Sequence, residues 1–199
     1  MLAESEGEWM FEKRIKAAHR FFFALYPPPI LARQTVEAMT PFAEGARMMR
    51  PERLHVTLDI LNDYAEWPDE IVPALVAAGS TVSAAPFDVT LDTVSGGAHT
   101  VALRPRLKNA PLERLHRSIA AARAGLGVDG RYGYDFSPHM TLVYRKGESV
   151  SRPVAPISWA AEEFVLVHSL IGPARHEVIA RWPLNGVPDA ADIGQLALF

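Results

Sequence analysis

The sequence predicts an α+β protein with two roughly equivalent lobes, each placing one short motif on a central strand. Segments with strand and helix patterns alternate along the chain before a closing pair of strands. Two of the strand segments, 54–60 and 139–144, each contain a tetrad that reads His, apolar, Thr, apolar. The tetrads are the only internal similarity, so the duplication is inferred from the order of elements.

The expected elements follow from periodicity and from residues that end strands or begin helices. Pro27 ends the first apolar run because proline cannot continue a ladder. Pro68, followed by two acidic residues, has the features of a helix start. Gly96 lies in a turn between two alternating segments, which predicts a hairpin. In order, we expect strand 20–26, helix 30–44, turn 50–53, strand 54–60, helix 68–84, strands 87–92 and 99–103, helix 111–124, a glycine-rich loop 125–133, strand 139–144, and strands 164–169 and 177–182.

The ends of the chain differ in composition from the rest. Residues 1–19 are expected to be a polar or partly helical extension, and residues 20–184 the bilobal domain. Residues 185–199 are rich in Asn, Gly, Pro, Asp and Ala, which predicts a flexible tail.

Composition excludes several classes of protein. The chain has 199 residues, 22% of them charged, and a net charge of −3, which argues against wholesale neutralisation of nucleic-acid phosphates but permits a local basic site. It contains no Cys, so disulfides, thiolate nucleophiles and Cys-based zinc sites are excluded. Acidic residues precede any basic one at the N-terminus, unlike a secretory signal. We expect a cytoplasmic, monomeric protein without a membrane span.

The tetrads His55-Val56-Thr57-Leu58 and His139-Met140-Thr141-Leu142 are the candidate functional site. On a strand, side chains at i and i+2 share a face, so each tetrad directs an imidazole and a hydroxyl one way and two apolar side chains to a core. Two imidazoles in opposite protonation states can remove a proton from water and give one to a leaving oxygen. The hydroxyls can hydrogen-bond the non-bridging oxygens of a phosphodiester.

Two other interpretations of the tetrads stay open. Chance supplies about 0.3 His-x-Thr matches in a chain of this composition, and a lone strand histidine is more often structural. Metal binding by the two histidines is the other rival. The nearby carboxylates Asp59, Asp63 and Asp135 have no recognised ligand spacing, so we expect no metal and no cofactor.

The two tetrads resemble the paired H-x-T-x signature of the 2H phosphoesterases. More narrowly, the chain resembles the RNA 2′,3′-cyclic phosphodiesterases long called 2′-5′ RNA ligases. The resemblance covers residues from about 20 to 184 and includes 20–25, Arg53-Leu54, 136–138 and 181–184. It implies a bilobal 2H fold in which two pseudo-symmetric antiparallel sheets with outer helices flank a central groove.

The resemblance also implies an activity and roles for individual residues. The activity is hydrolysis of a 2′,3′-cyclic phosphate of RNA or nucleotides to a 2′-phosphate. His55 would protonate the departing 3′ oxygen, His139 would activate water, and Thr57 and Thr141 would hold the phosphate. A non-catalytic binder of nucleotides or RNA ends, and the reverse ligation reaction, are the alternatives.

Further candidates lie around the tetrads. The family commonly has a basic residue shortly after the second tetrad; here Arg145 is either that phosphate contact or a solvated turn residue. Phe22 can stack on a base or pack in the core. Tyr132 and Tyr134 lie in the glycine-rich loop and are expected base contacts. Four other histidines have no matched partner and are expected to be surface or core residues: His99, His116, His168 and His176. Arg104 and Arg106 form either a basic rim or a solvated pair.

The chain closes on a separate motif. Gln195, Leu196, Leu198 and Phe199 resemble the Q-L-x-L-F peptide by which bacterial proteins dock on the DNA sliding clamp. A Gln and a terminal Leu-Phe pair fill a hydrophobic pocket in such peptides. Packing of the same residues against the parent domain is the alternative.

Overall fold

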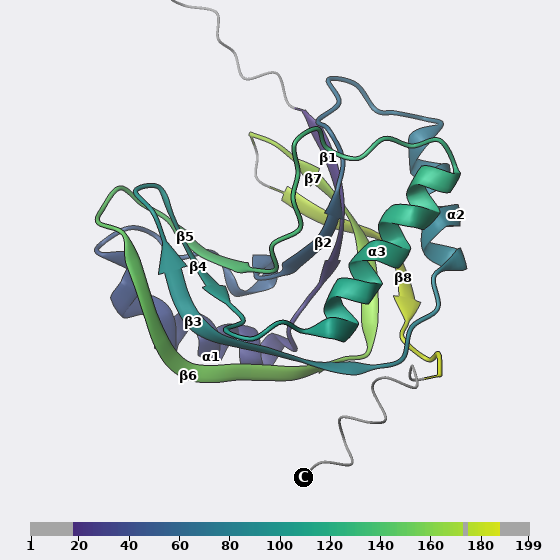
Figure 1. The fold of residues 1–199 in the computed structure, drawn as a ribbon. Coiled ribbons are helices and arrows are strands. Elements are labelled where there is room, and N and C mark those ends of the chain that lie inside the picture. Colours follow the sequence, from purple (N-terminus) through teal and green to yellow (C-terminus); the bar gives the residue numbers. More distant parts are fainter. Residues whose placement is uncertain (1–17, 173–174, 188–199) are drawn as a thin grey trace, which may run out of the picture.

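The computed structural model describes residues 18–172 and 175–187. They form one eight-stranded, wholly antiparallel sheet with three α-helices (Figure 1). The strands are β1 (His19–Leu25), β2 (Val56–Ile60), β3 (Phe87–Gly96), β4 (Thr100–Arg104), β5 (Met140–Tyr144), β6 (Val150–Ala161), β7 (Glu163–Leu170) and β8 (Arg175–Pro183). The helices are α1 (Pro29–Met39), α2 (Ile71–Thr81) and α3 (Ala110–Gly125), with short 3-10 helices η1 (Thr40–Ala43) and η2 (Pro51–Arg53).

The sheet consists of two four-stranded halves. The strand order is β6-β3-β4-β5-β2-β1-β7-β8, so the two tetrad strands are the innermost of their halves and meet at the centre. One residue pair, Val56 with Met140, joins them. The predicted α+β class and its two antiparallel lobes are confirmed.

Two elements tie each half of the sheet to the other. Helix α3 follows β4 in the chain but bonds to β2: His116 Nδ1 donates to the Leu58 carbonyl at 2.7 Å, and Arg123 Nε lies 2.6 Å from Asp59 in a buried ion pair. In the other direction, η1 follows β1 and α1 but contacts β6, where the Arg152 guanidinium lies 4.4 Å from the centre of the Phe42 ring. Figure 1 shows α3 beside β2, and α1 behind β3 and β6.

The apolar residues of both tetrads belong to the main core. Val56, Leu58, Met140 and Leu142 are all fully buried, as the alternation predicts. Phe22, Ala24, Val165 and Val167 form a second, smaller cluster. Because successive side chains on a strand point to opposite faces, Phe22 lies on the opposite face of β1 from the core residues Phe21 and Phe23.

The structure differs from the sequence prediction in a few elements. Strand β6 was not predicted because it contains Pro153 and Pro156; it lies at the edge of the sheet, where a missing ladder N–H is tolerated. Strands β2 and β5 begin one residue after His55 and His139, so both histidines precede the strands that were expected to contain them. Gly96 lies at the end of β3, where a Cβ would clash with the Thr100 carbonyl.

Some predictions concern segments outside the described residues. The extension 1–17 and the tail from 188 onward, including the QLALF peptide, lie outside them. In the described part of the chain, no helix is long and apolar enough to cross a membrane.

Candidate active site

The register of β2 against β5 brings the polar residues of the two tetrads onto one face. Val56 pairs with Met140, and both side chains are buried in the core. Their neighbours His55, Thr57, His139 and Thr141 therefore point to the opposite side, since side chains alternate along a strand. In an antiparallel pair with this register, His55 and His139 are diagonal neighbours, typically about 7–8 Å apart. We call the surface formed by these four side chains the histidine face.

Both imidazoles are held in the same way. His55 Nδ1 donates to the Arg53 carbonyl at 2.7 Å, and His139 Nδ1 donates to the Ser137 carbonyl at 2.7 Å. In each case the acceptor lies two residues before the histidine. Because a carbonyl can only accept, the neutral tautomer carries its proton on Nδ1 and leaves Nε2 as the free acceptor. Each ring therefore presents one nitrogen for proton exchange.

His55 lies among aromatic rings. The Phe22 ring is stacked on it with centroids 4.8 Å apart, Tyr26 is tilted against it at 5.7 Å, and His176 makes an edge contact at 5.5 Å. Burial, with smaller contributions from the nearby His139 and Arg53, lowers the pKa of His55 to about 4, although the hydrogen bond to the Arg53 carbonyl acts in the opposite direction. His55 is therefore neutral at pH 7 in the free protein. The influence of His139 is consistent with the closeness implied by the register.

His139 has a more polar environment. No ring contact to it occurs among residues 18–172 and 175–187; its neighbour is Arg104, whose Nη1 donates to Ser137 Oγ at 2.8 Å. Burial makes the largest contribution to the lowered pKa of His139, and the Arg104 cation acts in the same direction. The two histidines thus share an orientation but not a setting.

Two arginines beside this face have no acidic partner among residues 18–172 and 175–187. Arg53 contributes the carbonyl that holds His55, and Arg104 bonds the residue whose carbonyl holds His139. In the described part of the chain, neither guanidinium forms an ion pair with a carboxylate. Uncompensated cations beside two imidazoles favour an anion as the missing partner.

The two threonines are available for a ligand. Both side chains are half-buried, and in residues 18–172 and 175–187 neither hydroxyl has a hydrogen-bond partner or is buried away from solvent. Each can donate one hydrogen bond to an oxygen placed over the histidine face. The four tetrad residues expected from the sequence are therefore brought together.

Arg145 has bonding partners outside the tetrads. Its Nε donates to the Phe42 carbonyl at 3.1 Å, its Nη2 contacts Glu44 at 2.9 Å and donates to the Glu148 carbonyl at 3.2 Å, and the side chain is buried. Such bonds are those of a structural arginine, and they correct the expectation of a solvated turn residue. The predicted phosphate contact stays untested.

The predicted base contacts have different positions. Phe22 is 3% exposed and packs on His55, so it combines the core and site interpretations. Tyr132 is 96% exposed, and its backbone N–H donates to Asn62 Oδ1. Tyr134 is half-buried, and burial raises its pKa to about 12. Whether any of the three contacts a base stays a prediction.

Three residues that lie beside this face were not predicted from the sequence to belong to the site. His176 had no matched partner in the sequence, and only the β7–β8 pairing brings it to His55. Tyr26 was assigned only to the end of a strand. Arg53 was noted for its position before the first tetrad, and no spacing rule indicates that its guanidinium turns toward His176.

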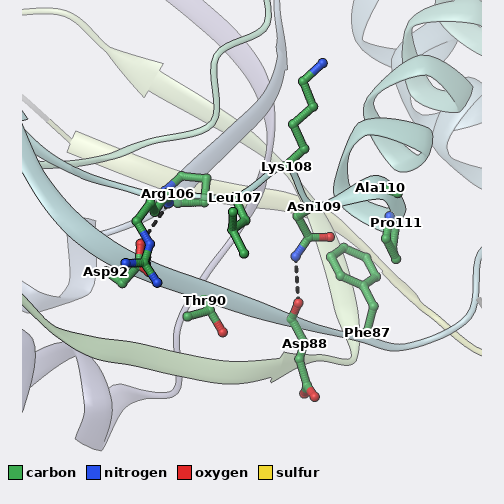
Figure 2. Close-up of a pocket in the computed structure, with 11 residues that line it drawn as sticks. Phe87, Asp88, Thr90, Asp92, Arg106, Leu107, Lys108, Asn109, Ala110 and Pro111 are labelled. Carbon is green, nitrogen blue, oxygen red and sulfur yellow. Dashed lines mark hydrogen bonds and ion pairs between the residues drawn. The ribbon is translucent and has the colours of Figure 1, made fainter. Parts of the chain in front are cut away.

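A separate pocket is lined by none of the four residues of the histidine face. It is formed by β3 and the segment between β4 and α3, and Figure 2 shows Asp92 with Arg106, and Asn109 bonded to the Asp88 carbonyl. These contacts connect the segment to β3. In the described ranges, no cluster of three or more His, Cys, Asp or Glu side chains could hold a metal ion.

Comparisons with known proteins define the class. A sequence model of the 2′-5′ RNA ligase superfamily matches residues 27–170, more than half of the chain. The chain therefore belongs to this superfamily, whose members are 2H phosphoesterases. A comparison with curated protein sequences gave no match.

Solved structures from the same class resemble the chain over most of its length. E. coli LigT in complex with ATP is 25% identical, with a TM-score of 0.69 over 84% of this chain and 99% of LigT. The LigT complex with 3′-AMP is 27% identical, with a TM-score of 0.70 over 84% and 98%. The Thermus thermophilus protein TT0787 is 28% identical, with a TM-score of 0.66 over 84% and 98%. These matches agree with the eight-stranded antiparallel architecture.

Proposed function

We propose that this phosphoesterase opens 2′,3′-cyclic phosphate ends of RNA or nucleotides to 2′-phosphomonoesters by acid–base catalysis at His55 and His139. The observation that carries the proposal is that the two imidazoles make equivalent hydrogen bonds. Each donates Nδ1–H to a carbonyl two residues upstream, and each leaves Nε2 free on the same face. This arrangement suits a reaction that moves one proton in and one proton out.

The proposed reaction uses the face as follows. One neutral imidazole accepts a proton at Nε2 from water as the water oxygen bonds to phosphorus. The bond from phosphorus to the 3′ oxygen breaks, and the other imidazole, protonated at Nε2, donates to that oxygen. The product keeps the phosphate on the 2′ oxygen, and the two histidines exchange protonation states.

The threonines of the face and two arginines beside it stabilise the negative charge on the non-bridging phosphate oxygens. The hydroxyls of Thr57 and Thr141 donate to the non-bridging oxygens, and Arg53 and Arg104 supply positive charge beside them. Their lack of carboxylate partners among the described residues supports this role. No step of this scheme requires a metal.

The family resemblance implies that His55 is the proton donor, and the structure adds a condition to that role. Because burial lowers the pKa of His55 to about 4, His55 is neutral at pH 7 in the free protein and must become protonated when the substrate binds. A bound phosphate dianion or monoanion raises the pKa of a nearby imidazole by favouring its charged form. The donor would therefore be protonated in the complex and neutral in the free protein.

The relatives support nucleotide phosphates as the substrate class. Structures of E. coli LigT have been solved in complex with ATP, 3′-AMP, NADP+ and phosphate. All four ligands carry phosphate, and three carry a nucleoside. We infer that the histidine face of this chain accepts ligands of the same kind.

A substrate panel tests the proposal. We expect turnover of 2′,3′-cyclic mononucleotides or of RNA oligonucleotides with a cyclic 3′ end, with 2′-phosphate as the product by phosphorus NMR. 2′-5′-linked oligonucleotides and ADP-ribose cyclic phosphate complete the panel and reveal ligation-type or alternative substrates. Binding of these compounds without turnover would instead identify a non-catalytic nucleotide binder. Each reaction is run with and without a chelator, and a loss of rate with the chelator would contradict metal-independent catalysis.

The C-terminal peptide supports a separate proposal about partners. Gln195, Leu196, Leu198 and Phe199 have the pattern of a sliding-clamp ligand. We propose that they bind the bacterial clamp while the phosphoesterase domain stays free. A pull-down with purified clamp should capture the full chain and lose it when residues 195–199 are deleted; equal capture of both would end the proposal.

A further inference from the structure

A third histidine lies against the face. His176 is in β8, directly opposite Ser169 in β7, and Ser169 is in turn opposite Arg20 in β1. Its ring makes edge contacts with Phe22 and His55, each at a centroid distance of 5.5 Å. It therefore lies beside the face without belonging to either tetrad.

His176 and Arg53 share a hydrogen bond whose direction is fixed. Arg53 Nη2 lies 3.2 Å from His176 Nε2. A guanidinium has only donors, so His176 Nε2 must be the acceptor and the ring must be neutral with its proton on Nδ1. The surroundings agree: burial, with His55, Arg53, Arg20 and Arg50, lowers the pKa of His176 to about 3. The acceptor is therefore present at every physiological pH.

Arg53 has two connections to the face. Its backbone carbonyl accepts from His55 Nδ1, and its guanidinium donates to His176. Its Nε is buried without a partner, while Nη1 has none among the described residues and is not buried. An arginine that is held at one nitrogen, open at another and without an ion-pair partner among the described residues is suited to contact an anion.

We propose that His176 is a positioning residue that fixes the Arg53 guanidinium beside His55, so that Arg53 meets a phosphate oxygen of the substrate. The inference rests on the proposed function for the identity of that phosphate. His176 touches no reacting atom. Without its acceptor, the long Arg53 side chain is free to adopt other rotamers, and binding must then overcome the entropy of ordering it.

Four variants test this role. His176→Phe keeps a ring against Phe22 and His55 but removes the acceptor. His176→Gln places an amide oxygen near the position of Nε2 and restores it. Arg53→Ala and the double variant Arg53→Ala/His176→Phe complete a cycle. His168→Phe is the matched control, because His168 also lies on a strand of this half but bonds to His19 on the opposite face.

The measurements are the KM and kcat for 2′,3′-cyclic AMP and the Kd for 3′-AMP by calorimetry. We expect His176→Phe to raise both KM and Kd about tenfold, with kcat changed less than threefold, since the lost bond orders a binding group. His176→Gln should stay within threefold of the unchanged protein. The double variant should bind no more weakly than Arg53→Ala, because both changes remove the same interaction.

Several outcomes would overturn the inference. His176→Phe binding 3′-AMP normally, His176→Gln being as impaired as His176→Phe, or additive effects in the double variant would each contradict action through Arg53. An equal loss in His168→Phe would point to general destabilisation and would also overturn it. If the chain binds 3′-AMP with the expected pattern but hydrolyses nothing, the proposed function fails and the positioning role stands. If it neither binds nor hydrolyses, both fail.

Discussion

The two half-sites of the histidine face share a backbone arrangement and differ in everything around it. His55 and His139 both donate Nδ1–H to a carbonyl two residues upstream at 2.7 Å. His55 is then surrounded by the rings of Phe22, Tyr26 and His176, which come from β1, the end of that strand, and β8. His139 has the Arg104 cation from β4 instead.

This difference shows that the direction of each imidazole and its proton affinity are set by different parts of the chain. Residues adjacent in sequence set the direction of each imidazole, so a short motif suffices to repeat it. The proton affinity of each imidazole depends on strands far away in the chain, and these differ between the halves. Burial among rings holds the pKa of His55 at about 4, while the pKa of His139 is lowered by burial and a neighbouring cation. A symmetric motif therefore carries an asymmetric pair, as a reaction with one acid and one base requires.

Removal of either histidine tests the pair with the largest expected effect. His55→Ala and His139→Ala should each lower kcat for a 2′,3′-cyclic nucleotide by about 10²–10⁴-fold, because each removes one proton transfer. The double variant should be little worse than the more impaired single variant, since the two groups act as a unit. His99→Ala is the control, because that side chain is exposed and belongs to neither tetrad.

The pH–rate profiles of these variants sharpen the comparison. The unchanged enzyme should give a bell-shaped curve, and each variant should lose one limb, which assigns the acid and the base. Because kcat/KM reports the free protein and kcat the complex, the limb belonging to the acid should lie at higher pH in the kcat profile. Unchanged activity in both alanine variants, or a flat profile between pH 5 and 8, would contradict the two-histidine mechanism.

Substitution of the threonines tests the two half-sites with a smaller expected loss of kcat/KM. Thr57→Val and Thr141→Val keep the shape of each side chain and remove the hydroxyl. Each should lower kcat/KM by about 10–100-fold, the range for a hydrogen bond to a charged oxygen. Equal losses would indicate that both hydroxyls contact the phosphate, and a loss in only one half would show that the phosphate sits closer to that tetrad. Circular dichroism should show that both variants remain folded.

The success and failure of sequence analysis follow the same division between local and distant control. The tetrads, their alternation and their pairing in two lobes were predictable, because Val56, Leu58, Met140 and Leu142 mark the buried side by periodicity alone. His176 was not, because its place depends on the register of β7 with β8. Strand β6 was missed because Pro153 and Pro156 argue against a strand unless its edge position is known. The bonds of Arg145 to the Phe42 and Glu148 carbonyls were not predictable either, because no local pattern indicates them.

Arg104 offers a way to alter one half alone. Arg104→Ala removes a cation that lowers the pKa of His139, so that pKa should rise and the corresponding limb of the pH–rate profile should move to higher pH. We expect kcat/KM to fall about three- to tenfold as well, from the lost attraction for phosphate. Arg106→Ala is the matched control: Arg106 pairs with Asp92 outside the face. A shifted limb in the control, or none in Arg104→Ala, would contradict the assignment.

The pH dependence of stability gives the smallest expected effect and compares the halves without a substrate. The folded pKa values of His55 and His176, about 4 and about 3, lie below the ordinary value of 6.5. Below pH 6.5 the unfolded chain therefore binds more protons than the folded one, and stability should fall as pH falls from 7 to 5, by about 1–3 kcal/mol in the free energy of unfolding. Most carboxylates stay ionised in this window, so histidines dominate the change. Chemical denaturation at pH 7, 6 and 5 measures it. His176→Phe should flatten the dependence, since it removes one neutral buried imidazole. A protein that is equally stable or more stable at pH 5 would show that the rings around His55 do not hold it neutral, and the contrast between the two half-sites would then have to come from Arg104 alone.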